Sequence, residues 1–190
     1  DGQALTLLAT ANMALGRHSK ATALMQDALK TQDNPAYRTA LGLSLVGDGQ
    51  MASGLMELEA SYRKDPRQVQ AATALIQLYL RSNQARKAVP IAEQLVKTQG
   101  AEAGYHNLLG MALGQASDLK GARAAFEKAL SIDPNQSAAK LNLAKLEIVT
   151  RAYGPAAARL NDILKAPPNN SDAMFELAVL ADRKGEQAEA

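Results

Sequence analysis

Apolar side chains recur along this chain with a period of about 34 residues. The leucines that mark the period are spaced by 33, 34, 34, 34 and 34 residues: Leu8, Leu41, Leu75, Leu109, Leu143 and Leu177. A second ladder, of small residues, keeps the same spacings: Ala21, Gly54, Ala88, Ala122, Ala156 and Ala190. Two ladders in phase indicate one structural unit repeated, and this period predicts pairs of helices that stack into a solenoid.

Numbering each unit so that the leucine holds position 7 and the small residue position 20 gives six units. They span residues 2–34, 35–68, 69–102, 103–136, 137–170 and 171–190, the last one truncated. Apolar residues at positions 4 or 5, 7, 8 and 11, and again at 20, 24, 27 and 28, predict two amphipathic helices per unit. Small residues at 8 and 20 let the two helices approach closely. We therefore expect a single array in which each unit contacts its neighbours.

Turn residues fall where this scheme needs them. Positions 15 and 16, between the two helices, hold Gly16-Arg17, Gly49-Gln50, Asn83-Gln84, Ser117-Asp118, Arg151-Ala152 and Gly185-Glu186. Gly and Asn suit a left-handed helix C-cap, and Ser or Asp suits the N-cap that follows. Helix breaks between units are predicted at Asp65-Pro66, Gly100, Asp133-Pro134 and Pro167-Pro168.

The unit at residues 103–136 carries a family pattern most completely. Its Leu109-Gly110, Ala122, Phe126, Ala129 and Pro134 resemble the tetratricopeptide repeat (TPR) pattern. The usual Trp at position 4 is absent from every unit. The resemblance spans the whole chain, and it implies an all-α, right-handed α-α superhelix of about five and a half helix–turn–helix repeats.

Four stretches suggest a narrower resemblance. Residues 93–97, 107–110, 122–134 and 141–144 are similar to the TPR-repeat lipoproteins of the PEP-CTERM/exosortase system in Gram-negative bacteria. Those proteins are encoded with exopolysaccharide biosynthesis loci. The resemblance implies a periplasmic or outer-membrane-anchored scaffold linked to exopolysaccharide production or protein sorting, although the sequence is also compatible with the cytoplasm.

Composition excludes several classes of protein. Hydrophobic residues make up 47% of the chain and aromatic residues 4%, and the apolar mass is Ala and Leu, so we expect no strand. The net charge is +2, and the longest basic groupings, at residues 63–67 and 81–87, are interrupted, so we interpret both as solvated helix surface and expect no nucleic-acid partner. No apolar run approaches the ~20 residues that span a bilayer. Because the chain opens inside a repeat without an initiator Met, we interpret it as a segment of a longer protein.

No catalytic or metal-binding constellation is visible. The chain has no Cys, which excludes thiolate catalysis and disulfides. His18 and His106 fall in distant units, so no convergent ligand set forms. Gly47 and Gly49 mark a helix end and its turn rather than a phosphate-binding loop. We expect no enzyme activity, no cofactor and no metal.

Binding is predicted on the first helix of each unit, whose positions 2, 5, 9, 12 and 13 should line a concave groove. The candidate groove residues are Thr39, Leu43, Thr73, Gln77, Arg81, Asn107, Met111, Gln115, Lys145 and Ile148. Their amides and hydroxyls can hydrogen-bond the backbone of a protein or peptide segment, and the apolar members can hold its side chains. The family's carboxylate clamp is not reproduced, since Asn107 and Asn142 stand without its basic partners.

The leading hypothesis is a non-catalytic protein–protein interaction scaffold, and three alternatives stay open. The same groove could contact the exopolysaccharide itself during export. An RNA-reading helical repeat is disfavoured by the near-neutral charge and the small residues at 8 and 20. A catalytic domain could lie outside this segment. The truncated last unit also leaves Phe175, Leu177, Ala178 and Leu180 without their usual second helix, so self-association through this end is expected.

Overall fold

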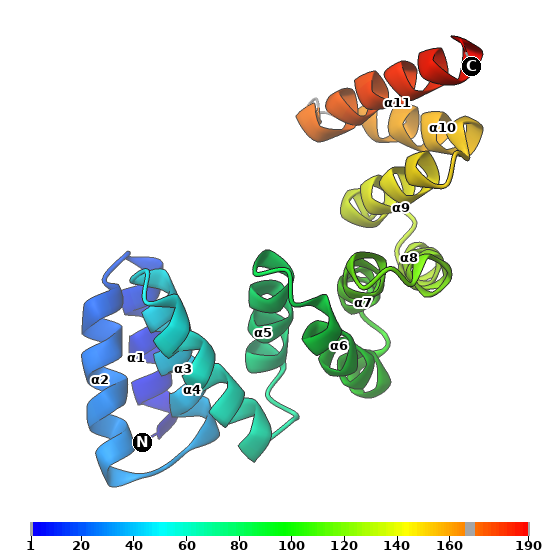
Figure 1. The fold of residues 1–190 in the computed structure, drawn as a ribbon. Coiled ribbons are helices and arrows are strands. Elements are labelled where there is room, and N and C mark those ends of the chain that lie inside the picture. The colour runs from blue at the N-terminus through cyan, green and yellow to red at the C-terminus, as the bar shows by residue number, and fades with distance from the viewer. Residues whose placement is uncertain (1, 166–169, 190) are drawn as a thin grey trace. The chain divides into compact units, whose positions relative to one another are not determined.

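The computed structural model describes residues 2–165 and 170–189, with only the helical backbone described for residues 186–189. Within these ranges the chain forms eleven α-helices and no strand (Figure 1). The first helices of the repeats are α1 (Gly2–Ala14), α3 (Pro35–Gly47), α5 (Val69–Arg81), α7 (Ala103–Gln115), α9 (Ser137–Val149) and α11 (Ser171–Glu189). The second helices are α2 (His18–Thr31), α4 (Met51–Lys64), α6 (Ala85–Gln99), α8 (Leu119–Ile132) and α10 (Tyr153–Leu164). The alternation matches the predicted pair of helices per repeat.

The chain divides into two compact parts that each contain several repeats. They are called the N-terminal unit, Asp1–Ile91, and the C-terminal unit, Ala92–Ala190. In the N-terminal unit α1 contacts α3 and α3 contacts α5, while α2 and α4 pack against these first helices. The C-terminal unit repeats this arrangement, with α7 against α9 and α9 against α11. The first helices therefore form one layer within each unit. The organisation of the chain as a single array with the six repeat boundaries stays a prediction.

The turns inside the repeats share one backbone conformation. Five residues at position 15 have left-handed φ values: Gly16 (70°), Gly49 (81°), Asn83 (57°), Ser117 (71°) and Arg151 (61°). The structure thus confirms the left-handed cap expected of Gly and Asn and extends it to Ser117 and Arg151, which lack a glycine's freedom at positive φ. Asp118 is the expected N-cap, because its carboxylate accepts a hydrogen bond from the Gly121 backbone N–H at 2.9 Å.

The sixth predicted turn was wrong. Helix α11 runs without a break from Ser171 to Glu189, through Gly185 and Glu186. Among the described residues, nothing lies within 4 Å of where a Cβ on Gly185 would be, so no packed neighbour obstructs continuation of the helix. Helix continuation then satisfies the backbone hydrogen bonds. The predicted break at Pro167-Pro168 and the ladder residue Ala190 lie outside the described residues.

The leucine ladder and the small-residue ladder meet in the core of each unit. In the N-terminal unit Leu41 on α3 is buried in one cluster with Ala21 and Met25 of α2. In the C-terminal unit Leu143 on α9 is buried with Ala122 and Phe126 of α8. Position 7 is thus covered by the second helix of the preceding repeat, which explains why the two ladders keep the same phase.

Glycines allow the closest approach between helices. A Cβ built on Gly54 of α4 would lie 2.7 Å from the Gly42 carbonyl oxygen of α3 and 3.0 Å from the Val46 backbone nitrogen. Both neighbours are backbone atoms, so no rotamer change can relieve the contact. The glycine at position 20 is therefore required by packing at this point of the ladder.

Replacing Gly54 by Ala should destabilise the N-terminal unit. Overpacking of this kind costs about 1–3 kcal/mol, whereas Gly→Ala in a helix otherwise stabilises by about 1 kcal/mol. Because the obstructing atoms are backbone, we expect a net loss of about 1 kcal/mol or more in urea unfolding. The matched control is Gly185→Ala in α11, where nothing lies within 4 Å and unchanged or increased stability is expected. Equal effects of the two substitutions would contradict the packing argument.

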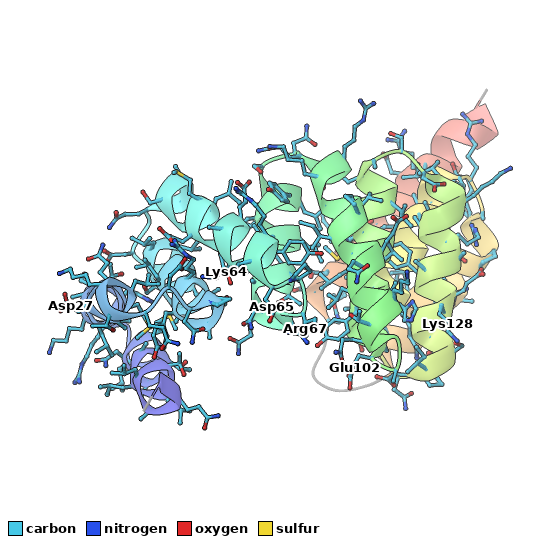
Figure 2. All side chains as sticks on the ribbon, turned by 90° about the horizontal axis from the view of Figure 1, so that it is seen from below. Asp27, Lys64, Asp65, Arg67, Glu102 and Lys128 are labelled. Atoms are coloured by element: carbon cyan, nitrogen blue, oxygen red, sulfur yellow. The ribbon has the colours of Figure 1, made fainter. Side chains whose placement is uncertain are left out.

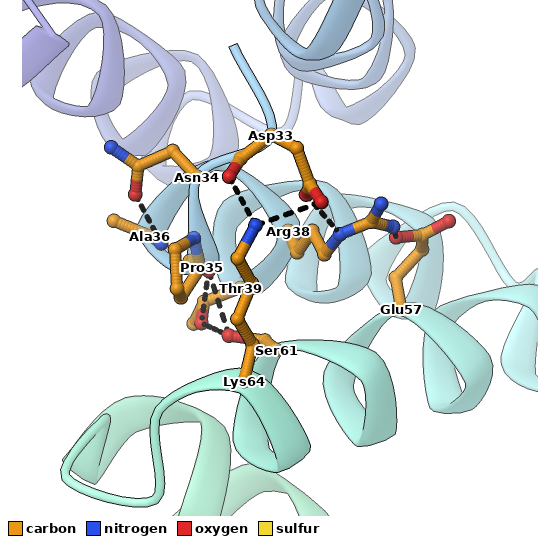
Figure 3. A network of polar contacts seen from close by, with 9 residues as sticks. All are labelled: Asp33, Asn34, Pro35, Ala36, Arg38, Thr39, Glu57, Ser61 and Lys64. Atoms are coloured by element: carbon orange, nitrogen blue, oxygen red, sulfur yellow. Dashed lines mark hydrogen bonds and ion pairs between the residues drawn. The ribbon is translucent and has the colours of Figure 1, made fainter.

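A polar network ties the first repeat to the second (Figure 3). The Asp33 carboxylate, between α2 and α3, pairs with Lys64 at 2.8 Å and Arg38 at 2.7 Å, and Arg38 also reaches Glu57 at 2.8 Å. The hydrogen bond from Lys64, which has the largest effect, and the hydrogen bond from Arg38 lower the pKa of the Asp33 carboxyl below its ordinary value. Asn34 caps α3 by accepting a hydrogen bond from the Ala36 N–H at 2.8 Å. The inter-repeat loop is thereby fixed to α3 and α4.

Candidate partner-binding surface

The first helices differ from the second helices in charge. Helices α1, α3, α5 and α7 contain no Asp or Glu. Charged side chains occur on the second helices, such as the exposed Asp27 of α2 and Lys128 of α8 (Figure 2), and on the first helices α9 and α11. In the N-terminal unit the first-helix layer therefore offers amides, hydroxyls and apolar groups with few charges.

In the N-terminal unit the structure exposes Gln77 and Arg81 of α5, while Leu43 of α3 and Thr73 of α5 are half-buried. The Thr73 hydroxyl donates to its own helix, at the Val69 carbonyl oxygen 2.9 Å away. The expectation that Thr39 faces a ligand was wrong, since only 2% of it is exposed. Its hydroxyl lies 2.7 Å from the Ser61 hydroxyl of α4, inside the packed interface (Figure 3).

In the C-terminal unit Met111 and Gln115 of α7 and Lys145 of α9 are exposed, as predicted for a groove surface. Ile148 is not, because it is buried in a cluster with Ala144 and Leu160. Its expected contact with a ligand is therefore corrected: position 12 of this repeat packs against α10.

An amide pair joins two first helices. The Asn142 side chain of α9 donates to the Asn107 carbonyl oxygen of α7 at 3.0 Å, and the Asn107 amide lies 3.9 Å from the Met111 sulfur. Asn107 is only 8% exposed, whereas Asn142 is half-buried. Asn142 is thus the more accessible amide, although it is absent from the predicted groove set. Asn142 stands at repeat position 6, one residue after the predicted groove position 5, and the prediction therefore left it out.

Charged and apolar side chains are also exposed on the same first helices, α7, α9 and α11. Lys145 of α9 lies 3.5 Å from Glu176 of α11. Met111 is 38% exposed and Phe175 of α11 is 66% exposed. A half-buried amide can hydrogen-bond a peptide backbone, and exposed apolar side chains on neighbouring first helices can hold the peptide's side chains.

The histidines fit structural roles. The His18 ring of α2 lies against Gly47 of α3, where an added Cβ would clash with it. His106 of α7 has its Nε2 atom 3.1 Å from the Gly100 carbonyl oxygen. Among the side chains described for residues 2–165 and 170–185, no cluster of three His, Cys, Asp or Glu residues could hold a metal ion. Among the helices in these ranges, none is both long and apolar enough to cross a bilayer.

Comparison with known proteins identifies the family. Two tetratricopeptide repeat models match residues 73–137 and 115–178, together more than half of the chain. Cellulose synthase operon protein C of Pseudomonas fluorescens is 28% identical in a match that covers 92% of this chain. The match spans only 14% of that relative's length.

Solved structures show the same fold. A tetratricopeptide repeat protein from Parabacteroides merdae superposes with a TM-score of 0.85 at 18% identity, over 98% of this chain and 75% of that one. MamA from Desulfovibrio magneticus gives a TM-score of 0.77 at 18% identity, over 86% and 93% of the two chains. The predicted all-α superhelix is confirmed, and the chain belongs to the tetratricopeptide repeat family.

Proposed function

We propose that this chain is a non-catalytic scaffold that binds a protein segment as part of exopolysaccharide production in the bacterial envelope. The TPR fold supports a protein-interaction scaffold, since TPR proteins are typically non-catalytic. The observation that carries the exopolysaccharide link is the similarity to cellulose synthase operon protein C over nearly the whole chain. The narrower likeness to PEP-CTERM proteins rests on the sequence stretches alone.

The surface proposed for the partner is the first-helix layer of the C-terminal unit. An extended peptide there would hydrogen-bond the Asn142 amide with its backbone and place apolar side chains on Met111 and Phe175. The absence of acidic residues from α7 favours a segment of low charge or a mildly acidic one. In the N-terminal unit, Gln77 and the half-buried Leu43 and Thr73 would extend the same type of surface.

Selection from a library of random linear peptides tests this proposal. A peptide selected on the chain should lose about tenfold in affinity with Phe175→Ala, because exposed aromatic anchors dominate such interfaces. Asn142→Ala should also weaken binding, through the lost backbone hydrogen bond. The matched control is Lys128→Ala on the exposed face of α8, which should leave affinity unchanged. Equal losses from Lys128→Ala and Phe175→Ala would contradict the proposed surface.

Self-association is proposed at the same end of the chain and needs its own control. The structure buries Leu180 and half-buries Leu177, but it leaves Phe175 and Ala178 exposed on α11. Sedimentation velocity, measured at the protein concentration used for peptide binding, distinguishes peptide binding by a monomer from self-association of the chain. A chain that is monomeric there and still loses peptide affinity with Phe175→Ala supports peptide binding independently of self-association.

The exopolysaccharide itself is the second candidate ligand. The first helices of the N-terminal unit favour it, because they contain no acidic residue and few charges, and their amides and hydroxyls can also bind sugar hydroxyls. Against it, Tyr37 of α3 and Tyr79 of α5 are buried and offer no exposed ring for a sugar face. Cello-oligosaccharides titrated beside the peptides decide between the two: saturable binding that Gln77→Ala removes would favour the saccharide.

A further inference from the structure

A pocket of about 300 Å³ lies in the N-terminal unit, between the beginning of α4 and the end of α5. Its lining residues are Met51, Ala52, Leu55, Leu78, Arg81, Ser82 and Gln84. Small-ligand and side-chain pockets begin at about this volume. The wall is mainly aliphatic, and Arg81 supplies the one cationic side chain among the lining residues.

The equivalent space between α2 and α3 is closed by polar contacts. There the Thr22 and Ser44 hydroxyls, at positions 21 and 10, lie 2.9 Å apart. Ser19, at position 18, donates to the Asp48 carboxylate at position 14, 3.2 Å away. The α2–α3 interface therefore differs from the α4–α5 pocket, because polar side chains meet there at the same repeat positions.

Between α4 and α5 those contacts cannot form. Leu55 and Leu78 replace the two hydroxyls, and Ala52 replaces the serine. Ser82, at the aspartate's position, instead donates to the Leu78 carbonyl oxygen at 2.8 Å within its own helix. The exchange of polar for aliphatic side chains opens the recess and makes its wall apolar.

The surroundings of the pocket are basic. Residues 69–91 contain no Asp or Glu, while the run at 81–87 contains Arg81, Arg86 and Lys87. Within the described part of the chain, Arg81 forms no ion pair with a carboxylate. The nearest acidic residues of α4 are already engaged, since Glu57 pairs with Arg38 and Glu59 accepts a hydrogen bond from the Tyr79 hydroxyl. An anionic partner would therefore meet positive charge without internal competition.

We infer that the α4–α5 pocket binds an acidic segment of a partner protein through an aliphatic anchor. The anchor side chain occupies the recess lined by Met51, Leu55 and Leu78, and a neighbouring carboxylate pairs with Arg81. A guanidinium forms strong paired hydrogen bonds with a carboxylate, and the aliphatic wall selects for an apolar neighbour, which a nucleic acid or a sugar does not supply. The inference rests on the proposed scaffold function but uses a different surface from the first-helix layer of the C-terminal unit, since its residues belong to α4, α5 and the turn after α5.

The probe is a capped pentapeptide with a central leucine flanked by glutamates, compared with its glutamine counterpart. Binding is followed by the methyl NMR chemical shifts of Leu55 and Leu78. The methyl signal of Met111, in the C-terminal unit, serves as the reference that the peptide should not change. The glutamate peptide should bind about tenfold more tightly than the glutamine peptide at low salt. Arg81→Gln should remove that difference, and Ala52→Phe, which fills the recess, should abolish binding of both peptides.

The matched control is Arg63→Gln, an exposed arginine in the other basic grouping of the sequence. It should change affinity by less than about twofold, as expected for an exposed, distant charge. Equal loss from Arg63→Gln and Arg81→Gln, or equal binding after the peptide's leucine is replaced by alanine, would overturn the inference in favour of unspecific anion binding. Phe175→Ala should leave this binding intact, so failure of the pocket and failure of the first-helix surface are distinguishable.

Discussion

Replacing Arg159 by Met is expected to destabilise the C-terminal unit by about 3 kcal/mol, the lower end of the range for breaking a buried ion pair. The Glu147 carboxylate on α9 is 1% exposed, and Arg159 of α10 donates two hydrogen bonds to it at 3.1 Å. Arg123 of α8 lies at 3.5 Å and remains in the variant, which is why we expect the lower end of the range. Urea unfolding at neutral pH measures the loss.

The double variant Glu147→Met/Arg159→Met separates charge from packing. It leaves no unpaired buried charge, so most of the lost stability should return, since aliphatic replacements of buried pairs are often neutral. Arg123→Met alone should cost less than Arg159→Met, because Arg123 is farther from the carboxylate and 37% exposed. If the double variant were as unstable as Arg159→Met, the lost packing of the arginine stem would explain the effect instead.

This buried ion pair also shows which part of the core could not be predicted from the sequence. Position 11 holds Leu45, Tyr79 and Leu113 in other repeats, and all three are at least half-buried. Glu147 stands at the same position. The periodicity of the sequence therefore predicts that it is buried, but it does not predict which side chains pair with its carboxylate. Its two arginines come from α8 and α10, and their approach depends on packing between helices rather than on spacing along one.

The ladders and turns were predictable because they are local or strictly periodic. Position 15 is left-handed in five repeats whether it holds Gly, Asn, Ser or Arg, so the repeat geometry determines the turn even where the residue does not favour it. The continuous α11 marks the limit of that rule. Gly185, at the same repeat position, lies inside this helix, and none of the described residues lies within 4 Å of where its Cβ would be.

The candidate surface could be predicted only in part. Positions 9 and 13 of the first helices are exposed at Gln77, Arg81, Met111 and Lys145, as expected. Positions 5 and 12 lie nearer the contacts with neighbouring helices, which buries Thr39, Asn107 and Ile148. A helix exposes a narrower stripe than the sequence pattern indicates when another helix packs on each side of it. Arg81 shows a second reason why the surface was predicted only in part. It also lines a pocket that α5 forms with α4, and the periodicity within α5 cannot reveal a contact between two helices.

Truncating the same ladder leucine in two repeats should have very different effects. Leu143 is fully buried beside Phe126, whereas Leu8 on α1 is 52% exposed. Leu143→Ala should cost about 2–5 kcal/mol, through lost burial and the cavity left behind. Leu8→Ala, an identical chemical change at position 7, should cost less than about 1 kcal/mol because water already reaches this side chain.

Hydrogen exchange read separately for α9 and α1 measures both losses without assuming that the two compact units unfold together. Protection in α9 should fall with Leu143→Ala, whereas protection in α1 should change little with Leu8→Ala. The comparison depends on one physical difference, since Leu143 has the second helix of the preceding repeat packed over it and the described structure places no such helix over Leu8. A comparable loss from Leu8→Ala would mean that another surface buries α1 in solution, and position 7 would then be covered at the first repeat as it is at the fifth.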